Sequence, residues 1–198
     1  MSRDVAAVLL AAGSGSRFGG AKLLAPLRAP AHGVPAGTPI GVAACRHLLA
    51  AIPDVVAVVR SGDDVLAARL RDAGARTIEC ARAYEGMGVT LAAGVATISS
   101  AAGWIVALAD MPWIDPGTIA SVAARLRDGA SIVAPTYRGR RGHPVGFSAR
   151  HCAALLALTG DEGAKAILTA HADALESIEV DDAGVLRDVD RPEDLNDV

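Results

Sequence analysis

Short strand-like runs alternate along this chain with longer stretches of helical period, and this alternation limits the fold more than any other feature. The strand-like runs are Val5–Leu10, Val55–Val59, Arg76–Glu79, Trp104–Leu108 and Ser131–Pro135. The stretches of helical period between them are Ile40–Ala51, Asp63–Asp72, Val89–Ser99 and Asp115–Asp128. Parallel strands covered on both faces by helices produce this pattern. The sequence therefore predicts an α/β fold in three α/β/α layers, with a Rossmann-like, mostly parallel sheet.

The pattern changes after Pro135. The segment Tyr137–Phe147 is punctuated by glycine and predicts a β-ribbon or loop, and two helical stretches follow at Ala149–Leu158 and Glu162–Ala170. From Glu176 the tail alternates like an edge strand and then becomes acidic and proline-broken. We expect a small β-ribbon lobe that covers one end of the sheet.

Composition excludes several classes of protein. A hydrophobic fraction of 52% is too high for a disordered chain, and 3% aromatic residues with a net charge of -3 argue against a nucleic-acid binder. No apolar run is long enough to span a membrane. The three cysteines have no metal-ligand or disulfide spacing and are interpreted as reduced thiols. A cytoplasmic location without membrane or nucleic-acid partners is expected.

A glycine-rich motif follows the first predicted strand directly. Gly13, Gly15 and Gly19 allow close approach of the backbone to a polyphosphate, and Arg17 and Lys22 add positive charge. A triphosphate cradle is the interpretation that these residues favour. A purely structural turn remains an alternative, and so does a dinucleotide site with NADPH, in which Arg60 just after the second strand could contact the 2′-phosphate. The dinucleotide site needs a βαβ unit of about 30 residues, whereas the second run ends 46 residues after Gly13.

The run from Leu10 to Lys22 resembles the signature of the MobA-like nucleotidyltransferases, in the form typical of the molybdenum cofactor cytidylyltransferase branch. Further segments match the same family in the same order: Gly86–Leu91, Leu108–Pro112, Gly142–Val145, Gly160–Ala164 and Asp188–Leu195. The resemblance implies a nucleotidyltransferase fold and transfer of CMP from CTP to the phosphate of molybdopterin, with release of pyrophosphate. It also implies transient contact with a molybdoenzyme or its chaperone.

The resemblance assigns nucleotide binding to two loops. Their charge leads us to expect that Arg17 and Lys22 hold the triphosphate, and by resemblance the second loop lies at the base and ribose, where its Gly-Met-Gly form favours cytidine over guanine. The nucleotide-binding residues implied are Leu10, Ala11, Ala12, Gly13, Ser14, Gly15, Ser16, Arg17, Lys22, Gly86, Met87, Gly88 and Thr90. Taken alone, the second loop could equally be an ordinary helix start.

Asp110 closes an apolar run with a carboxylate, and ligands of open α/β sheets bind beyond the carboxyl ends of the strands. Oxygen ligands of this kind suit Mg²⁺ or Mn²⁺. By resemblance Asp110 is the metal ligand and, with Arg17 and Lys22, a catalytic residue. Asp190 is a candidate second ligand. The alternative is that Asp110 caps a turn and that Asp190 only begins the final turn.

The acceptor side is assigned to the second part of the chain. Arg140 and Arg141 lie in a basic stretch suited to an anionic acceptor, although a solvated hairpin tip is the alternative. By resemblance the acceptor-binding residues are Arg140, Arg141, Gly142, His143 and Asp161, and Asp161 is also a plausible helix cap. We expect a single domain over 1–198, with a nucleotide-binding part at about 1–112 and an acceptor-side part at about 113–198.

One segment departs from the family pattern. Residues 26–39 contain four prolines and two glycines, which predicts an exposed loop and leaves the acceptor open. Three other functions therefore stay under consideration: nucleotidyl transfer to another phosphorylated acceptor, an NADPH-dependent oxidoreductase, and a non-catalytic nucleotide carrier.

Overall fold

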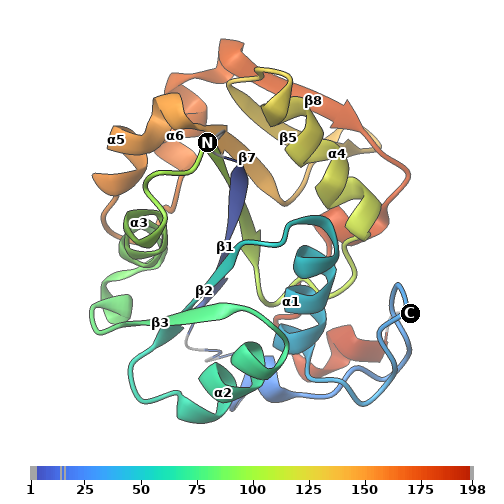
Figure 1. Cartoon of the computed structure of the whole chain (residues 1–198). Helices are drawn as coiled ribbons and strands as arrows, with labels where there is room; N and C mark the ends of the chain where they lie inside the picture. The colour runs from blue at the N-terminus through green and yellow to red at the C-terminus, as the bar shows by residue number, and fades with distance from the viewer. Residues whose placement is uncertain (1–3, 14, 16, 197–198) are drawn as a thin grey trace.

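The computed structural model describes residues 4–13, 15 and 17–196, and a central sheet of eight strands organises them (Figure 1). The strand order is β3-β2-β1-β4-β7-β5-β6, and β8 pairs with β5. The strands are β1 (Val5–Ala11), β2 (Val55–Arg60), β3 (Arg76–Cys80), β4 (Gly103–Leu108), β5 (Ile132–Tyr137), β6 (Arg140–Arg141), β7 (Val145–Ser148) and β8 (Leu175–Glu179). The α-helices are α1 (Ile40–Ala51), α2 (Asp64–Asp72), α3 (Met87–Thr97), α4 (Pro116–Arg127), α5 (Cys152–Leu156) and α6 (Lys165–Ala170).

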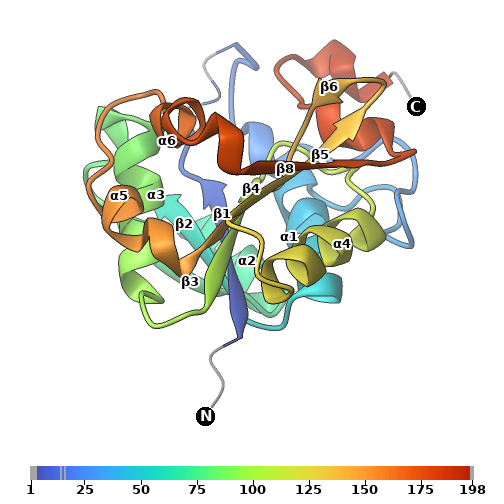
Figure 2. The same cartoon turned by 90° about the horizontal axis from the view of Figure 1, so that it is seen from above.

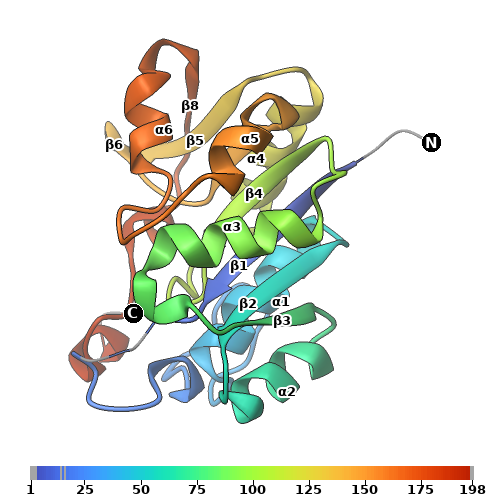
Figure 3. The ribbon, with the colours of Figure 1, turned by 90° about the vertical axis from the view of Figure 1, so that its left-hand side faces the viewer.

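Strand β1 lies at the centre and separates two hydrophobic cores. It is buried along its whole length, and it pairs in parallel with β2 on one side and β4 on the other. Alternate side chains point to opposite faces, so Leu9 packs with α1, α2 and α4 whereas Leu10 packs with α3, α5 and α6. Figures 1 and 3 show these two helical layers. The predicted three-layer architecture and its mostly parallel sheet are confirmed.

The predicted separate ribbon lobe is only partly present. β5 extends to Tyr137 and forms a short hairpin with β6, but β7 enters the central sheet antiparallel, between β4 and β5. Figure 2 shows β6 beside the C-terminal segment at this end of the molecule. Phe147 on β7 is fully buried opposite Trp104 of β4. Burial of this aromatic side chain in the common core explains why β7 belongs to the sheet and not to an appended lobe.

The two helices predicted after Ala149 are shorter than expected. Residues Ala149–His151 form a 3-10 turn before α5, and α6 begins only at Lys165. The prediction that Asp161 caps a helix is wrong, because the residue before α6 is Ala164 and no side chain caps that helix. By contrast, Asp115 caps α4 through a 2.6 Å bond from the Gly117 amide to its carboxylate.

The proline-rich segment 26–39 contains no regular helix or strand, as its composition predicts. It is not simply an exposed loop, however. Leu27, Ala31 and Val34 are buried and belong to the core beneath α1 and α4. His47 of α1 contributes a ring nitrogen 3.0 Å from the Ala31 carbonyl oxygen. The segment 26–39, which we call the insertion, is therefore packed against the core.

Both cores contain residues from before and after position 112, so the two halves of the chain fold around shared cores. Among the described residues, no helix is long and apolar enough to cross a membrane.

Candidate active site

A pocket of about 500 Å³ opens at the carboxyl ends of the parallel strands. The register pairs Leu10 of β1 with Val58 of β2 and with Leu108 of β4. The loops that leave these three strands therefore start side by side, which brings Gly13, Arg60 and Asp110 to one pocket. Its lining consists of Leu10, Ala12, Gly13, Lys22, Leu23, Arg60, Ala83, Tyr84, Gly86, Met87, Thr90, Leu108, Asp110 and Asp161.

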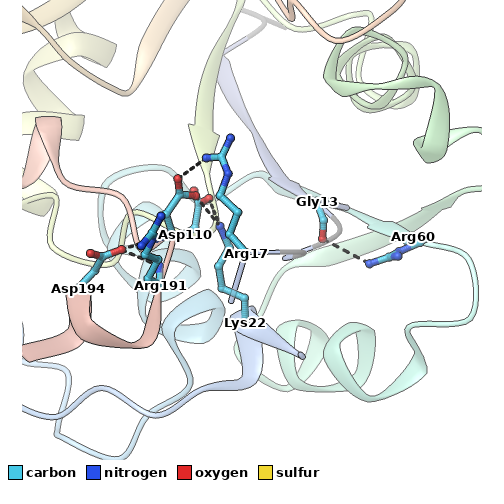
Figure 4. A network of polar contacts seen from close by, with 8 residues as sticks. Gly13, Arg17, Lys22, Arg60, Asp110, Arg191 and Asp194 are labelled. Carbon is cyan, nitrogen blue, oxygen red and sulfur yellow. Dashed lines mark hydrogen bonds and ion pairs between the residues drawn. The ribbon is translucent and has the colours of Figure 1, made fainter. Parts of the chain in front are cut away.

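A network of opposite charges lies at one side of this pocket (Figure 4). The Lys22 ammonium donates to Asp110 Oδ2 at 2.7 Å and lies 3.8 Å from Asp190 Oδ1. The Arg17 guanidinium donates to the other oxygen of Asp190 at 2.6 Å. Lys22 is only 11% exposed, whereas Arg17 is 72% exposed. An ion pair as exposed as Arg17–Asp190 stabilises a fold little, so the Arg17 side chain is available to another anion.

Backbone geometry in the glycine-rich loop positions Lys22. Gly15 has a φ of +58°, and a Cβ there would lie 3.0 Å from the Gly20 carbonyl oxygen and 3.1 Å from Lys22 Cβ. Glycine is the residue that accepts both this left-handed conformation and this crowding. The loop can thus turn back tightly and place Lys22 at the start of a 3-10 turn, Lys22–Leu24.

The C-terminal segment positions Asp190. The Val189 amide donates to the Asp110 carbonyl oxygen at 2.8 Å, which holds the chain beside the loop after β4. Asp194 then accepts from the amides of Asp190 and Arg191, both at 2.7 Å. These two backbone bonds lower the pKa of Asp194 and keep it ionised. The C-terminal segment from Val189 to Asp194 is therefore a structural part of the site.

Three carboxylates, those of Asp110, Asp188 and Asp190, lie close to Lys22. Burial raises the pKa of Asp188, and the neighbouring charges of Asp110 and Asp190 act in the same direction. Asp110 and Asp190 both lie beside the ammonium group of Lys22, so the two carboxylates can reach a single cation. In proteins, Mg²⁺ or Mn²⁺ is commonly bound by one or two carboxylates together with phosphate oxygens and water. The donor set therefore fits a divalent ion. Within the described residues, no group of three or more His, Cys, Asp or Glu side chains forms a complete metal cluster.

The loop Gly86–Gly88 forms another side of the pocket and packs against a distant loop. The Gly88 amide donates to the Gly160 carbonyl oxygen at 2.8 Å, and a Cβ on Gly88 would lie 2.6 Å from the Thr159 carbonyl oxygen. Gly86 has a φ of +123° and lies directly against Asp161. Asp161 consequently lines this first pocket, together with the residues expected to bind the nucleotide.

A second pocket of about 240 Å³ adjoins the first and shares Leu10, Met87 and Leu108 with it. Arg141, Gly142 and His143 line this second pocket. Burial lowers the pKa of His143, so its imidazole is neutral near pH 7.

Several residues expected in the site lie elsewhere. Ala11 packs its side chain into the core on the opposite face, and Arg140 lines neither pocket. Gly15 lies in a small cleft beside the loop, whereas Ser14 and Ser16 lie outside the described residues.

Sequence reasoning also assigned no role in a triphosphate site to two residues that line the first pocket, Arg60 and Tyr84. Arg60 reaches the Gly13 carbonyl oxygen at 3.3 Å (Figure 4), yet the sequence suggested it only as a 2′-phosphate contact in the dinucleotide alternative. Tyr84, which is 82% exposed, also lines the first pocket. The position of Arg60 at the end of a strand next to β1 was the signal that could have identified it.

Comparison with known families shows to which family the chain belongs. A model of the MobA-like NTP transferase domain matches residues 7–175. The chain belongs to this family. This MobA-like protein is accordingly a nucleotidyltransferase, and the matched residues include every part of both pockets.

Solved structures of other proteins share the fold of this MobA-like protein. Rv0371c from Mycobacterium tuberculosis superposes with a TM-score of 0.82 at 23% identity, covering 99% of this chain and 97% of that one. The same protein is also known in complex with manganese, with a TM-score of 0.78 at 21% identity, covering 98% of this chain and 100% of that one.

Two further structures have the same architecture. A nucleotidyl transferase from Methanothermobacter has a TM-score of 0.78 at 21% identity, covering 96% of this chain and 94% of that one. CMP:2-keto-3-deoxy-manno-octonic acid synthetase in complex with CTP has a TM-score of 0.75 at 13% identity, covering 98% of this chain and 95% of that one. A search of curated proteins finds no significant match.

Proposed function

We propose that this MobA-like nucleotidyltransferase transfers CMP from CTP to the terminal phosphate of molybdopterin, or of a closely similar phosphorylated pterin, and releases pyrophosphate. The observation on which the proposal rests is the Lys22–Asp110–Asp190 arrangement at the mouth of the first pocket, where one ammonium ion meets two carboxylates. A manganese complex and a CTP complex among the similar structures support a divalent ion and a cytidine nucleotide.

In this proposal the first pocket binds the nucleotide. Lys22 and Arg17 contact the β- and γ-phosphates, and Gly86, Met87 and Thr90 surround the ribose and base. An oxygen of the acceptor phosphate attacks the α-phosphorus, the bond to the β-phosphate oxygen breaks, and pyrophosphate leaves. The two cationic side chains stabilise the negative charge that accumulates on the leaving group.

Asp110 and Asp190 would hold Mg²⁺ or Mn²⁺, which neutralises phosphate charge when bound. The acceptor would enter from the side of Arg141, Gly142 and His143. Because phosphoryl transfer depends mainly on position and charge, no protein side chain has to form a covalent intermediate.

The test is pyrophosphate release from the purified chain, with CTP or GTP, Mg²⁺ and either molybdopterin or a sugar phosphate. Release that requires CTP, Mg²⁺ and the pterin supports the proposal. Release with a sugar phosphate alone would assign a different acceptor. Oxidation of NADPH in a parallel assay without the pterin would point to the oxidoreductase alternative. Nucleotide binding with no release under any of these conditions would favour a nucleotide carrier.

A further inference from the structure

The insertion is the segment that departs from the family pattern, and it lies beside the two segments that carry Asp110 and Asp190. Figure 1 shows it in blue next to the red C-terminal segment, where the Arg28 guanidinium donates to the side-chain oxygen of Asn196. His32 contacts the loop that follows β4 and carries Asp110. The insertion is thus bonded to both segments.

A tight turn in the insertion presents His32 to that loop. Ala31 and Val34 exchange both backbone hydrogen bonds, at 2.9 and 2.8 Å, and the two residues between them, His32 and Gly33, have φ angles of +41° and +83°. A two-residue turn with positive φ at both central positions normally takes asparagine, aspartate or glycine at the first of them. Among the described residues, Arg138 is the one other non-glycine residue with a positive φ. Such a conformation persists where the surrounding contacts hold it.

The His32 ring is fixed by contacts at both of its nitrogens. Nε2 donates to the Trp113 carbonyl oxygen at 3.0 Å, and Nδ1 lies 3.4 Å from Asp115 Oδ2. The His47 ring packs edge-on against it, with 5.4 Å between the ring centroids. The His32 side chain is nevertheless 34% exposed and belongs to neither hydrophobic core. Its contacts therefore join the insertion to the loop without filling the interior.

The C-terminal segment also holds this loop at Trp113. The Arg187 guanidinium lies over the Trp113 ring, 4.2 Å from its centroid. A Cβ on Gly184 would lie 2.0 Å from the Trp113 carbonyl oxygen, so the backbone there passes directly against the atom that accepts from His32. Asp182 accepts from the Asp115 amide at 2.9 Å. The insertion and the C-terminal segment thus meet at the same two loop residues.

Contacts at Trp113 act on Asp110 through a short and stiff stretch of chain. Only Met111 and Pro112 separate the two residues; Met111 is buried, and proline has a fixed φ. The Asp110 carbonyl oxygen in turn accepts from the Val189 amide at 2.8 Å. A displacement of Trp113 therefore reaches both the Asp110 carboxylate and the C-terminal segment bonded to it.

We propose that His32 is a positioning residue for the metal site, and that the insertion fixes the loop after β4 so that Asp110 and Asp190 stay close enough to share one divalent ion. The inference rests on the proposed function and goes beyond it, because it gives a role to a segment outside the family motifs. Groups that fix the orientation of metal ligands commonly contribute to metal affinity. Loss of the His32 ring should therefore weaken metal binding while the protein stays folded.

The experiment titrates the full chain with Mn²⁺ in the presence of CTP, measures free Mn²⁺ by electron paramagnetic resonance, and uses CTP without protein as the blank. His32→Gly removes the ring, and glycine accepts the positive φ of this position. His32→Gln keeps a side-chain N–H that can donate to the Trp113 carbonyl oxygen. Arg138→Gly is the matched control, since Arg138 also has a positive φ and lines neither pocket.

We expect His32→Gly to weaken Mn²⁺ binding by about threefold or more and Arg138→Gly to leave it unchanged. His32→Gln should bind Mn²⁺ more tightly than His32→Gly, although glutamine is less suited than glycine to a positive φ. Weaker folding alone would give the opposite order, so this comparison separates positioning from stability. Calorimetry should give His32→Gly a melting temperature within about 5 °C of that of the wild type.

Three results would each overturn the inference. They are a loss of less than about threefold in His32→Gly, an affinity of His32→Gln no higher than that of His32→Gly, and a loss in Arg138→Gly as large as in His32→Gly. If the wild-type chain binds Mn²⁺ with CTP and His32→Gly matches it, only the role of His32 is wrong. If the wild-type chain binds no Mn²⁺ beyond the CTP blank, the metal site of the proposed function itself fails, whatever the variants show.

Discussion

At the scale of single residues, Asp110 is the side chain on which the proposed chemistry most depends. Asp110→Asn removes the carboxylate that faces Lys22 but keeps its shape. We expect turnover to fall about 100-fold or more, because the site loses the charge that pairs with cations at the α-phosphate. Loss of one partly exposed ion pair should lower the melting temperature by no more than about 5 °C.

Steady-state kinetics and calorimetry measure these two effects. Asp181→Asn is the control, since Asp181 is exposed and lines neither pocket. Undiminished turnover in a folded Asp110→Asn enzyme would contradict the role of this carboxylate.

At the scale of elements, contact of α3 with the sheet depends on Gly94. A Cβ at this position would overlap Val8 of β1 and lie 2.9 Å from Val58 Cγ2 of β2, and both valines are fully buried. Gly94→Ala should therefore destabilise the protein by about 1–3 kcal/mol through overpacking, although alanine has the higher helix propensity. Urea unfolding gives the value, and Thr97→Ala on the exposed face of α3 should be near neutral. A stabilised Gly94→Ala variant would show that the packing is looser than described.

The contact between α1 and the insertion 26–39 should make stability depend on pH. His47 is 2% exposed, and burial lowers its pKa below 6.5; the pKa of His151 shifts in the same direction. Below pH 6.5 the unfolded chain then binds more protons than the native protein, so the free energy of unfolding falls as the pH falls.

We expect a loss of up to about 1.4 kcal/mol per pH unit for each such histidine between pH 6.5 and 5.5, measured by urea unfolding. In His47→Gln this dependence should become smaller, and the part that remains should come from His143 and His151, whose pKa values burial also lowers. The same pH dependence in wild type and His47→Gln would mean that His47 is not buried in its neutral form.

At the scale of the whole molecule, the first pocket joins loops from β1, β2 and β4, and the C-terminal segment adds Asp190 beside Lys22, so ligand binding there should stabilise the entire fold. CTP with Mg²⁺ at about 100 times its Kd should raise the melting temperature by roughly 5–10 °C. Chelation of the metal should remove most of this increase, and so should Asp110→Asn. A larger shift with NADPH, independent of metal, would instead favour a dinucleotide site at Gly13.

The sequence by itself determined the features that depend on local pattern. Short apolar runs and stretches of helical period predicted the parallel strands and the helices between them, and the motifs placed Lys22 after β1 and Asp110 after β4. These features could be predicted because a strand buried on both faces is a continuous apolar run, and a helix buried on one face leaves a periodic pattern in neighbouring residues.

Only the tertiary structure decided what depends on distant pairing. β7 lies between β4 and β5, Asp190 meets Arg17 from 173 residues away, and Asp161 lies in the first pocket beside Gly86. No local period records which strand becomes a neighbour or which loop crosses a pocket. Those outcomes follow from how side chains such as Phe147 complete a shared core, and that packing is set by the whole chain at once.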